Sequence, residues 1–169
     1  MIRENRVMMK GNPLSLVGPE LKVGDKAPEF KAVDASFKKV SASDFKGKKV
    51  LISAVPSIDT GVCALQTKRF NEEAAKLQDV VFITISSDLP FAQKRFCDSE
   101  KIGKMNLLCD SVWHDFGEKY GVLVKDMGLL ARAVFVISAK GEISYVQIVG
   151  EITNHPDYDS AIEAVKRTK

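Results

Sequence analysis

The sequence predicts an α/β fold in which a central mixed sheet is flanked by helices. From residue 50 onwards, short apolar runs rich in β-branched residues alternate with segments of helical periodicity. This alternation is typical of parallel strands joined by crossover helices. The last two apolar runs, 133–137 and 143–149, are separated by a short segment that contains Gly141, which predicts an antiparallel hairpin. We therefore expect both parallel and antiparallel neighbours in one sheet.

The composition is that of an ordinary globular domain. The chain has 169 residues, of which 45% are hydrophobic and 28% are charged, so it is long enough to form one core and is not disordered. The 25 basic residues barely exceed the 22 acidic ones, and no basic stretch is interleaved with aromatic residues, which argues against nucleic-acid binding. We expect a single domain over residues 1–169, in which residues 1 to about 45 form an N-terminal extension.

Neither a membrane-spanning segment nor a secretory signal is predicted. The longest apolar run, 50–55, is far shorter than the ~20 residues that cross a bilayer. The first residues carry charges of both signs and no apolar stretch follows them, unlike a signal peptide. We therefore expect a cytoplasmic protein without a membrane partner, whose three cysteines suit transient rather than permanent disulfides.

The first strand–helix unit begins with a buried strand. Residues 50–55 are almost continuously apolar, as in a strand that is covered on both faces, and Pro56 ends the run. Apolar residues recur at helical spacing over 62–77, which predicts a helix. Thr60 is suited to be the N-cap of this helix.

The second unit repeats this arrangement. Residues 80–85 predict another buried strand. Ser87 or Asp88 is expected to cap the helix that follows, which has Pro90 in its first turn and extends to about residue 99.

Weaker patterns complete this part of the chain. We expect a third strand at 106–109, a short helix at 113–120 that Gly121 ends, and a closing helix at 158–167. The aromatic residues at the two ends of the short helix are interpreted as packing side chains.

The order of these elements, including the final hairpin, is that of a thioredoxin-like fold. An N-terminal extension precedes it. Within the extension, the apolar runs 7–9 and 14–17 flank a Gly-Asn-Pro sequence, which predicts a small β-hairpin.

Cys63 is the first candidate for chemistry. If Thr60 is the N-cap, this cysteine lies in the first turn of a helix, where free backbone N–H groups and the helix dipole stabilise a thiolate. The Thr60 hydroxyl could add a hydrogen bond to the sulfur. The alternative is structural, because Cys63 shares a helix face with Phe70 and Leu77 and a buried cysteine also serves as a small apolar filler.

Cys97 lies on the next predicted helix, 34 positions after Cys63. Since both helices should start at the same edge of the sheet, Cys97 is expected ~12 Å further along its helix axis. A disulfide requires Cα atoms within ~7 Å, so a bond between these cysteines needs at least one helical turn to unwind. The alternative for Cys97 is again a core residue.

Several segments resemble one known family. Residues 56–63 read PSIDTGVC and have the form Pro-x-x-x-Thr-x-x-Cys, which resembles the active-site loop of the peroxiredoxins. SDLPFAQ at 87–93, RFC at 95–97 and LARAV at 130–134 make the chain similar to the bacterial thiol peroxidase subfamily, which consists of atypical two-cysteine peroxiredoxins. The similarity extends from the N-terminal hairpin to about residue 158.

The resemblance implies a complete reaction cycle. Cys63 would attack the terminal oxygen of hydrogen peroxide or an organic hydroperoxide and become a sulfenic acid. Cys97 would condense with it to an intramolecular disulfide, which thioredoxin would reduce. The resemblance also implies a homodimer and no bound cofactor.

Three further residues have roles that the resemblance implies. Pro56 lacks an N–H and would fix the turn that shields the thiolate, while Thr60 would bond to the sulfur and to the incoming peroxide. Arg132 would supply a permanent positive charge beside Cys63. From the residues alone, the interpretation of Arg132 is a solvated side chain at the entrance of a strand.

Other functions have weaker support. A dithiol disulfide reductase would need a cysteine at position 66, where Gln66 stands. A redox sensor or a thioredoxin-like binding module, in which oxidation of Cys63 and Cys97 changes a binding surface, is the non-enzymatic alternative. Cys109 is interpreted as a structural thiol, and the absence of any Cys-x-x-Cys spacing argues against zinc.

Overall fold

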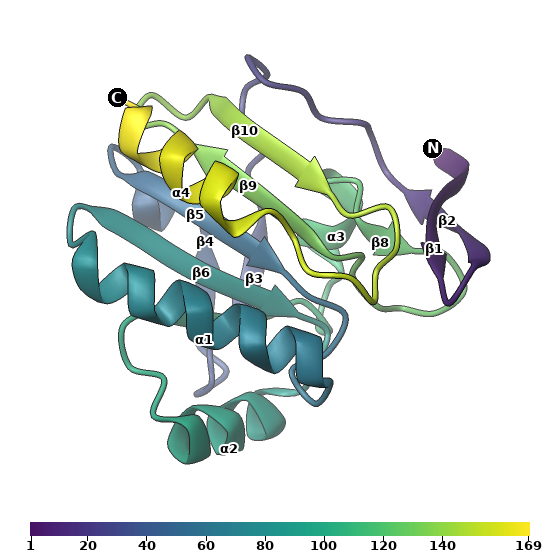
Figure 1. The fold of residues 1–169 in the computed structure, drawn as a ribbon, viewed down its shortest axis with the longest axis horizontal. Helices are drawn as coiled ribbons and strands as arrows, with labels where there is room; N and C mark the ends of the chain where they lie inside the picture. Colours follow the sequence, from purple (N-terminus) through teal and green to yellow (C-terminus); the bar gives the residue numbers. More distant parts are fainter.

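A computed structural model describes all 169 residues and contains a seven-stranded mixed sheet (Figure 1). The strand order is β10-β9-β5-β6-β7-β3-β4. These strands are β3 (Lys31–Val33), β4 (Lys39–Ser41), β5 (Lys49–Ala54), β6 (Val80–Ser86), β7 (Asn106–Cys109), β9 (Ala133–Ile137) and β10 (Ile143–Ile148). The neighbours β5, β6 and β7 are parallel, whereas β9 is antiparallel to both β5 and β10. The predicted mixed sheet and its closing hairpin are confirmed.

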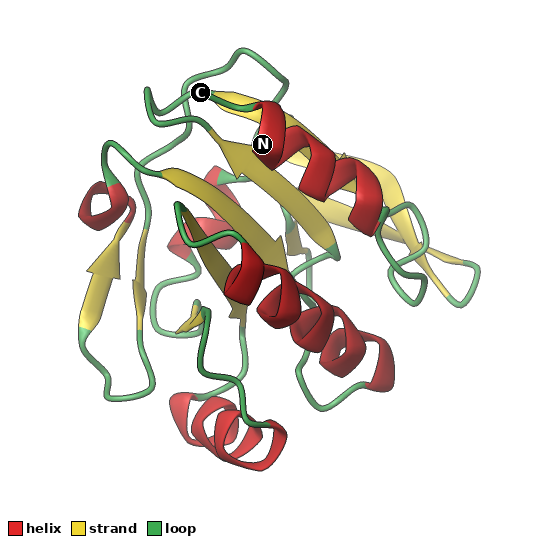
Figure 2. Ribbon diagram, turned by 60° about the vertical axis from the view of Figure 1, so that its left-hand side comes forward, coloured by secondary structure: helices red, strands yellow, loops and turns green.

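The helices cover the two faces of the sheet unequally (Figure 2). They are α1 (Gly61–Lys76), α2 (Pro90–Glu100), α3 (Asp115–Lys119), α4 (Tyr158–Arg167) and the 3₁₀-helix η1 (Ala42–Phe45). Side chains of α1, α2 and α4 belong to the apolar core on one face, and α3 contributes to the core on the other face. None of the helices combines the length and the apolar character needed to cross a membrane.

Alternating side chains of the central strands belong to these two cores. In β5, Val50 and Ile52 belong to the core beside α3, while Leu51 belongs to the core beside α1. Because both faces are covered, an almost continuous apolar run is required, as the sequence predicted for this strand and for β6.

The N-terminal hairpin is also confirmed. β1 (Ile2–Met9) and β2 (Asn12–Val17) pair antiparallel, and β8 (Leu123–Val124) joins β2 to make a separate three-stranded sheet. The rest of the extension was not predicted in detail: β3 and β4 extend the main sheet beyond β7.

Two sequence-based predictions about side chains were wrong. The N-cap of α2 is Leu89 rather than Ser87 or Asp88, and no side chain caps this helix. Trp113 lies before α3 and is 39% exposed, with the Lys31 ammonium 4.9 Å from its ring centre. Its ring is therefore not part of the helix packing.

The end of α3 follows the prediction. Gly121 follows the C-cap residue Tyr120 and has a φ of +67°, and a Cβ at this position would lie 1.8 Å from the carbonyl oxygen of Pro19. Only glycine fits this turn. Tyr120, next to it, is fully buried, and its hydroxyl donates a hydrogen bond to the carbonyl of Pro28.

Asp110 makes the stability of this region dependent on pH. Its buried carboxylate accepts hydrogen bonds from the backbone N–H groups of Phe116 and Gly117, each at 2.9 Å. Burial outweighs these bonds and raises the pKa of Asp110 from 3.8 to about 6. Between these two pH values Asp110 holds a proton in the folded protein that the unfolded chain has released. The stabilisation that this proton gives to the folded protein is fully present below pH ~4 and is lost as the pH rises through ~6.

We expect this contribution to be visible in the variant Asp110→Asn. The stability of the wild-type protein relative to the variant should fall by about 3 kcal/mol between pH 4 and pH 7. Urea unfolding of both proteins at several pH values measures this difference. A difference that stays constant over the range would show that Asp110 titrates normally.

Candidate active site

The loop between β5 and α1 places Cys63 at the start of a helix. Pro56 is buried two residues after the end of the strand at Ala54. Thr60 is the N-cap of α1, as predicted: its side-chain oxygen accepts a hydrogen bond from the N–H of Cys63 at 3.4 Å. The same hydroxyl donates to the carbonyl of Ser57 at 3.2 Å. It is thus engaged with the backbone and forms no hydrogen bond with the sulfur in this conformation.

Arg132 contacts the sulfur of Cys63 directly. Its Nη2 atom lies 3.2 Å from Sγ, and both residues are buried, with exposed fractions of 2% and 0%. Arg132 stands immediately before β9, which pairs with β5 and so brings the guanidinium next to the loop after β5. The interpretation of Arg132 as a solvated residue is therefore wrong.

Two other contacts fix the guanidinium. Nε of Arg132 donates to the carbonyl of Ile152 at 2.8 Å, and Nη1 donates to Oε1 of Gln66 at 2.7 Å. The Gln66 amide in turn donates to the hydroxyl of Ser53 on β5 at 2.7 Å. Sequence analysis missed this role of Gln66, although a polar residue three positions after Cys63 on a buried helix face is a detectable signal.

Arg132 places a positive charge beside the sulfur without a carboxylate to pair with it. No carboxylate lies within ion-pair distance of Arg132. A guanidinium stays charged in proteins, and a buried charge without a partner is costly. A thiolate at Cys63 would supply the missing opposite charge, and the first turn of α1 would stabilise it as well.

Asp88 is a second residue that sequence analysis did not assign to the site. Its carboxylate accepts hydrogen bonds from the Ser57 hydroxyl (2.7 Å), the Ile58 N–H (2.8 Å) and the Ser86 hydroxyl (2.6 Å). It therefore ties the loop before Cys63 to the segment that leads into α2. This use of the carboxylate also explains why Asp88 does not cap α2.

We expect Asp88→Asn to destabilise the protein by about 1–3 kcal/mol, because one amide oxygen cannot serve all three donors. Urea unfolding measures the loss. Asp59→Asn is the matched control, since Asp59 is an exposed carboxylate of the same loop whose ion pair with Arg95 spans 3.6 Å. Equal stability of the two variants would contradict a positioning role for Asp88.

Cys97 lies apart from this group. It is a half-buried residue near the end of α2 that packs against the core containing Cys63, and both cysteines are free thiols. Burial raises the pKa of Cys97, and the charge of neighbouring Asp98 acts in the same direction. α1 and α2 start at the same edge of the sheet, after β5 and β6 (Figure 1).

Cys109 is a buried thiol of β7, and its sulfur lies 2.9 Å from the Ser111 hydroxyl. Its surroundings suit the structural interpretation. The structure contains no cluster of three or more histidine, cysteine or acidic side chains with a spacing that suits a metal ion.

The comparison with known proteins agrees with this geometry. Residues 22–162 match the Redoxin family. The thiol peroxidase of Bacillus subtilis (strain 168) is 52% identical over 160 residues, which cover 95% of this chain and 96% of that protein. The thiol peroxidase of Listeria innocua serovar 6a is 52% identical over 162 residues, covering 96% and 98%.

Solved structures show the same relationship. A peroxiredoxin-like protein from Aquifex aeolicus has a TM-score of 0.90 and 46% sequence identity, covering 97% of this chain and 98% of that chain. A thiol peroxidase from Chromobacterium violaceum shares the fold, with a TM-score of 0.84 at 21% identity over 95% and 94% of the two chains. The chain therefore belongs to the Redoxin family and, within it, to the thiol peroxidases of the peroxiredoxin group.

Proposed function

We propose that this chain reduces hydrogen peroxide and organic hydroperoxides with Cys63 as the attacking thiol. The observation that carries the proposal is the 3.2 Å contact between Arg132 Nη2 and Cys63 Sγ at the start of α1. A buried cysteine that serves only as an apolar filler does not need a charged partner, whereas a nucleophilic thiolate does. The family of thiol peroxidases supports the same conclusion.

The chemistry of the first step follows from this contact. The Cys63 thiolate attacks the terminal oxygen of the hydroperoxide, a new S–O bond forms and the O–O bond breaks. The leaving oxygen takes a proton and departs as an alcohol or as water, and Cys63 becomes a sulfenic acid. The Arg132 guanidinium stabilises the negative charge while it moves from sulfur to the leaving oxygen.

Access to the sulfur requires movement of the loop that precedes it. Cys63 is 0% exposed in this conformation, so even a small peroxide cannot touch the sulfur without local opening. Thr60, by contrast, is exposed at the end of the same loop. Its hydroxyl would become a partner for the peroxide once it leaves the Ser57 carbonyl, while buried Pro56 anchors the start of the loop.

In the second step, Cys97 resolves the sulfenic acid. Its sulfur attacks the Cys63 sulfur, an S–S bond forms, and the hydroxyl group leaves with a proton as water. The position of Cys97 near the end of α2 means that the helix must partly unwind for this bond to form. Thioredoxin as the reductant of the disulfide, assembly into a homodimer and a cytoplasmic location complete the proposal.

The first experiment is a mass measurement on reduced protein that has been mixed with one equivalent of hydroperoxide. We expect the intact mass to fall by two hydrogens and a non-reducing peptide map to contain a Cys63–Cys97 crosslink. Thiols that remain reduced would overturn the peroxidase proposal. A crosslink through Cys109 would retain the peroxidase and overturn the assignment of Cys97.

We expect Cys97→Ser to separate the two steps. Cys63 should still consume about one equivalent of hydroperoxide and accumulate as a sulfenic acid, because the partners of the Arg132 guanidinium are Cys63, Gln66 and Ile152 and do not include Cys97. Continuous turnover with thioredoxin should be lost. A dimedone-type sulfenic acid probe and a coupled reductant assay measure the two effects. Sustained turnover of the variant would show that the disulfide is dispensable.

A further inference from the structure

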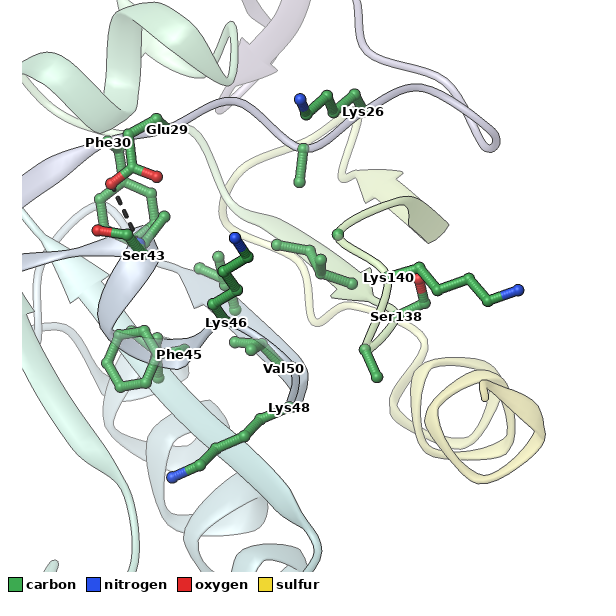
Figure 3. A pocket seen from close by; sticks show the side chains of 18 of the residues that line it. Lys26, Glu29, Phe30, Ser43, Phe45, Lys46, Lys48, Val50, Ser138 and Lys140 are labelled. Atoms are coloured by element: carbon green, nitrogen blue, oxygen red, sulfur yellow. Dashed lines mark hydrogen bonds between the residues drawn. The ribbon is translucent and has the colours of Figure 1, made fainter.

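A cavity of about 330 Å³ lies at the end of the sheet opposite to Cys63 (Figure 3). It is lined by the first residues of β5, by the turn between β9 and β10, and by the segment around Lys26 and Phe30. Cys63 follows the other end of β5. The cavity is therefore separate from the candidate active site.

The floor of the cavity is formed by apolar residues of the sheet face. Val50, Ile52 and Ile137 point to the core that α3 contributes to, and all three are buried. α3 and the N-terminal sheet cover this face near the other end of the strands. At this end η1 and an irregular segment lie over it, and buried Phe30 and half-buried Phe45 belong to the lining of the cavity.

The rim of the cavity is cationic. It contains Lys26, Lys46, Lys48 and Lys140, and none of these ammonium groups pairs with a carboxylate. In Figure 3, the side chain of Lys46 lies in the space between the lining segments, whereas those of Lys26, Lys48 and Lys140 extend outward.

Glu29 is the only acidic residue of the lining. Its carboxylate accepts a hydrogen bond from the N–H of Ser43 at 3.1 Å and so already has a partner. The rim therefore keeps an excess of positive charge above an apolar floor.

We propose that this cavity binds a medium-chain fatty carboxylate. The alkyl chain would lie along the apolar lining, against Phe45 and Val50, and the carboxylate would lie beside Lys46. A water or a methylene-sized group takes about 30 Å³, so the space accommodates a chain of roughly ten carbons. A phosphorylated polar metabolite fits the rim but would leave its polar groups against an apolar floor. The inference does not rest on the proposed peroxidase activity.

Titration of the whole protein with decanoate, followed by backbone amide NMR, tests the proposal. We expect saturable shifts at Gly47 and Gly141, which line the cavity, and none at Cys63. 1-Decanol has the same chain without the charge and should bind about tenfold more weakly, because it cannot form the charge-assisted contact.

Matched variants separate the role of the rim from non-specific attraction. Lys46→Met keeps the apolar stem and removes the charge, so decanoate binding should weaken about tenfold. Lys38→Met removes the same charge from an exposed residue outside the cavity and should leave binding unchanged. Ala27→Phe, which fills space in the cavity lining, should abolish binding while the dispersion of the amide NMR spectrum reports that the protein is folded.

Three results would overturn the proposal. The first is the absence of saturable shifts, and the second is equal binding of decanoate and 1-decanol. The third is an equal effect of Lys46→Met and Lys38→Met, which would mean that the ligand responds only to the overall charge of the protein.

Discussion

Replacing Cys63 with serine is expected to abolish peroxide consumption. A serine hydroxyl is not ionised at neutral pH, so the site would lose its nucleophile although the hydroxyl fits the same buried space. Cys97 cannot take over, because its pKa is raised and Arg132 does not contact it. Hydroperoxide loss in the presence of thioredoxin and its reductant measures the effect, and the rate should fall to that of the solution without protein.

Cys109→Ser is the control for this variant. Cys109 is also fully buried, so the same exchange of sulfur for oxygen occurs in the core, but without Arg132 as a neighbour. We expect this protein to retain its peroxidase rate. Activity in Cys63→Ser would contradict the proposal that Cys63 is the attacking thiol. If both serine variants lost activity because they failed to fold, Cys63→Ala would be used to test whether Cys63 is required.

The parts of the fold that sequence analysis predicted are long and periodic. The central strands and the helices α1, α2 and α4 each contain several apolar residues at one spacing, so pattern and structure agree within about two residues. β3, β4 and β8 have only three, three and two residues. Such short strands contain no period to recognise. They form by pairing with the edges of other strands: β3 pairs with β7, β4 with β3, and β8 with β2.

In the candidate site, too, residues close together in the sequence could be predicted, whereas a contact between distant residues could not. Pro56, Thr60 and Cys63 lie in one loop, so a strand end, an N-cap and a first helical turn can be predicted together. Arg132 reaches Cys63 across 69 positions. The residues alone indicated a solvated side chain, and only the resemblance to peroxiredoxins placed Arg132 in the site, because the contact depends on the pairing of β9 with β5.

Asp88 illustrates a different limit. Its type and position predict an N-cap, and the structure uses the same carboxylate to hold the loop before Cys63. A cap and a loop anchor both need an acceptor that faces backbone N–H groups. Sequence alone does not say whether the N–H groups of α2 or those of the loop before Cys63 lie nearer to the carboxylate. The parallel register of β5 and β6 brings the loop next to it.

Arg132→Met is expected to slow the oxidation of Cys63 by about 100- to 1000-fold, as the removal of a preorganised donor commonly does. The methionine fills similar space but supplies no charge for the thiolate or for the leaving oxygen. Stopped-flow measurement of Cys63 oxidation gives the rate.

Gln66→Met separates the charge of Arg132 from its placement. This variant keeps the guanidinium but removes the 2.7 Å contact with Nη1, so we expect a smaller loss of about tenfold. If Arg132→Met reacted at the wild-type rate, the first turn of α1 alone would activate Cys63. Arg132 would then be a structural link between Gln66 and the carbonyl of Ile152.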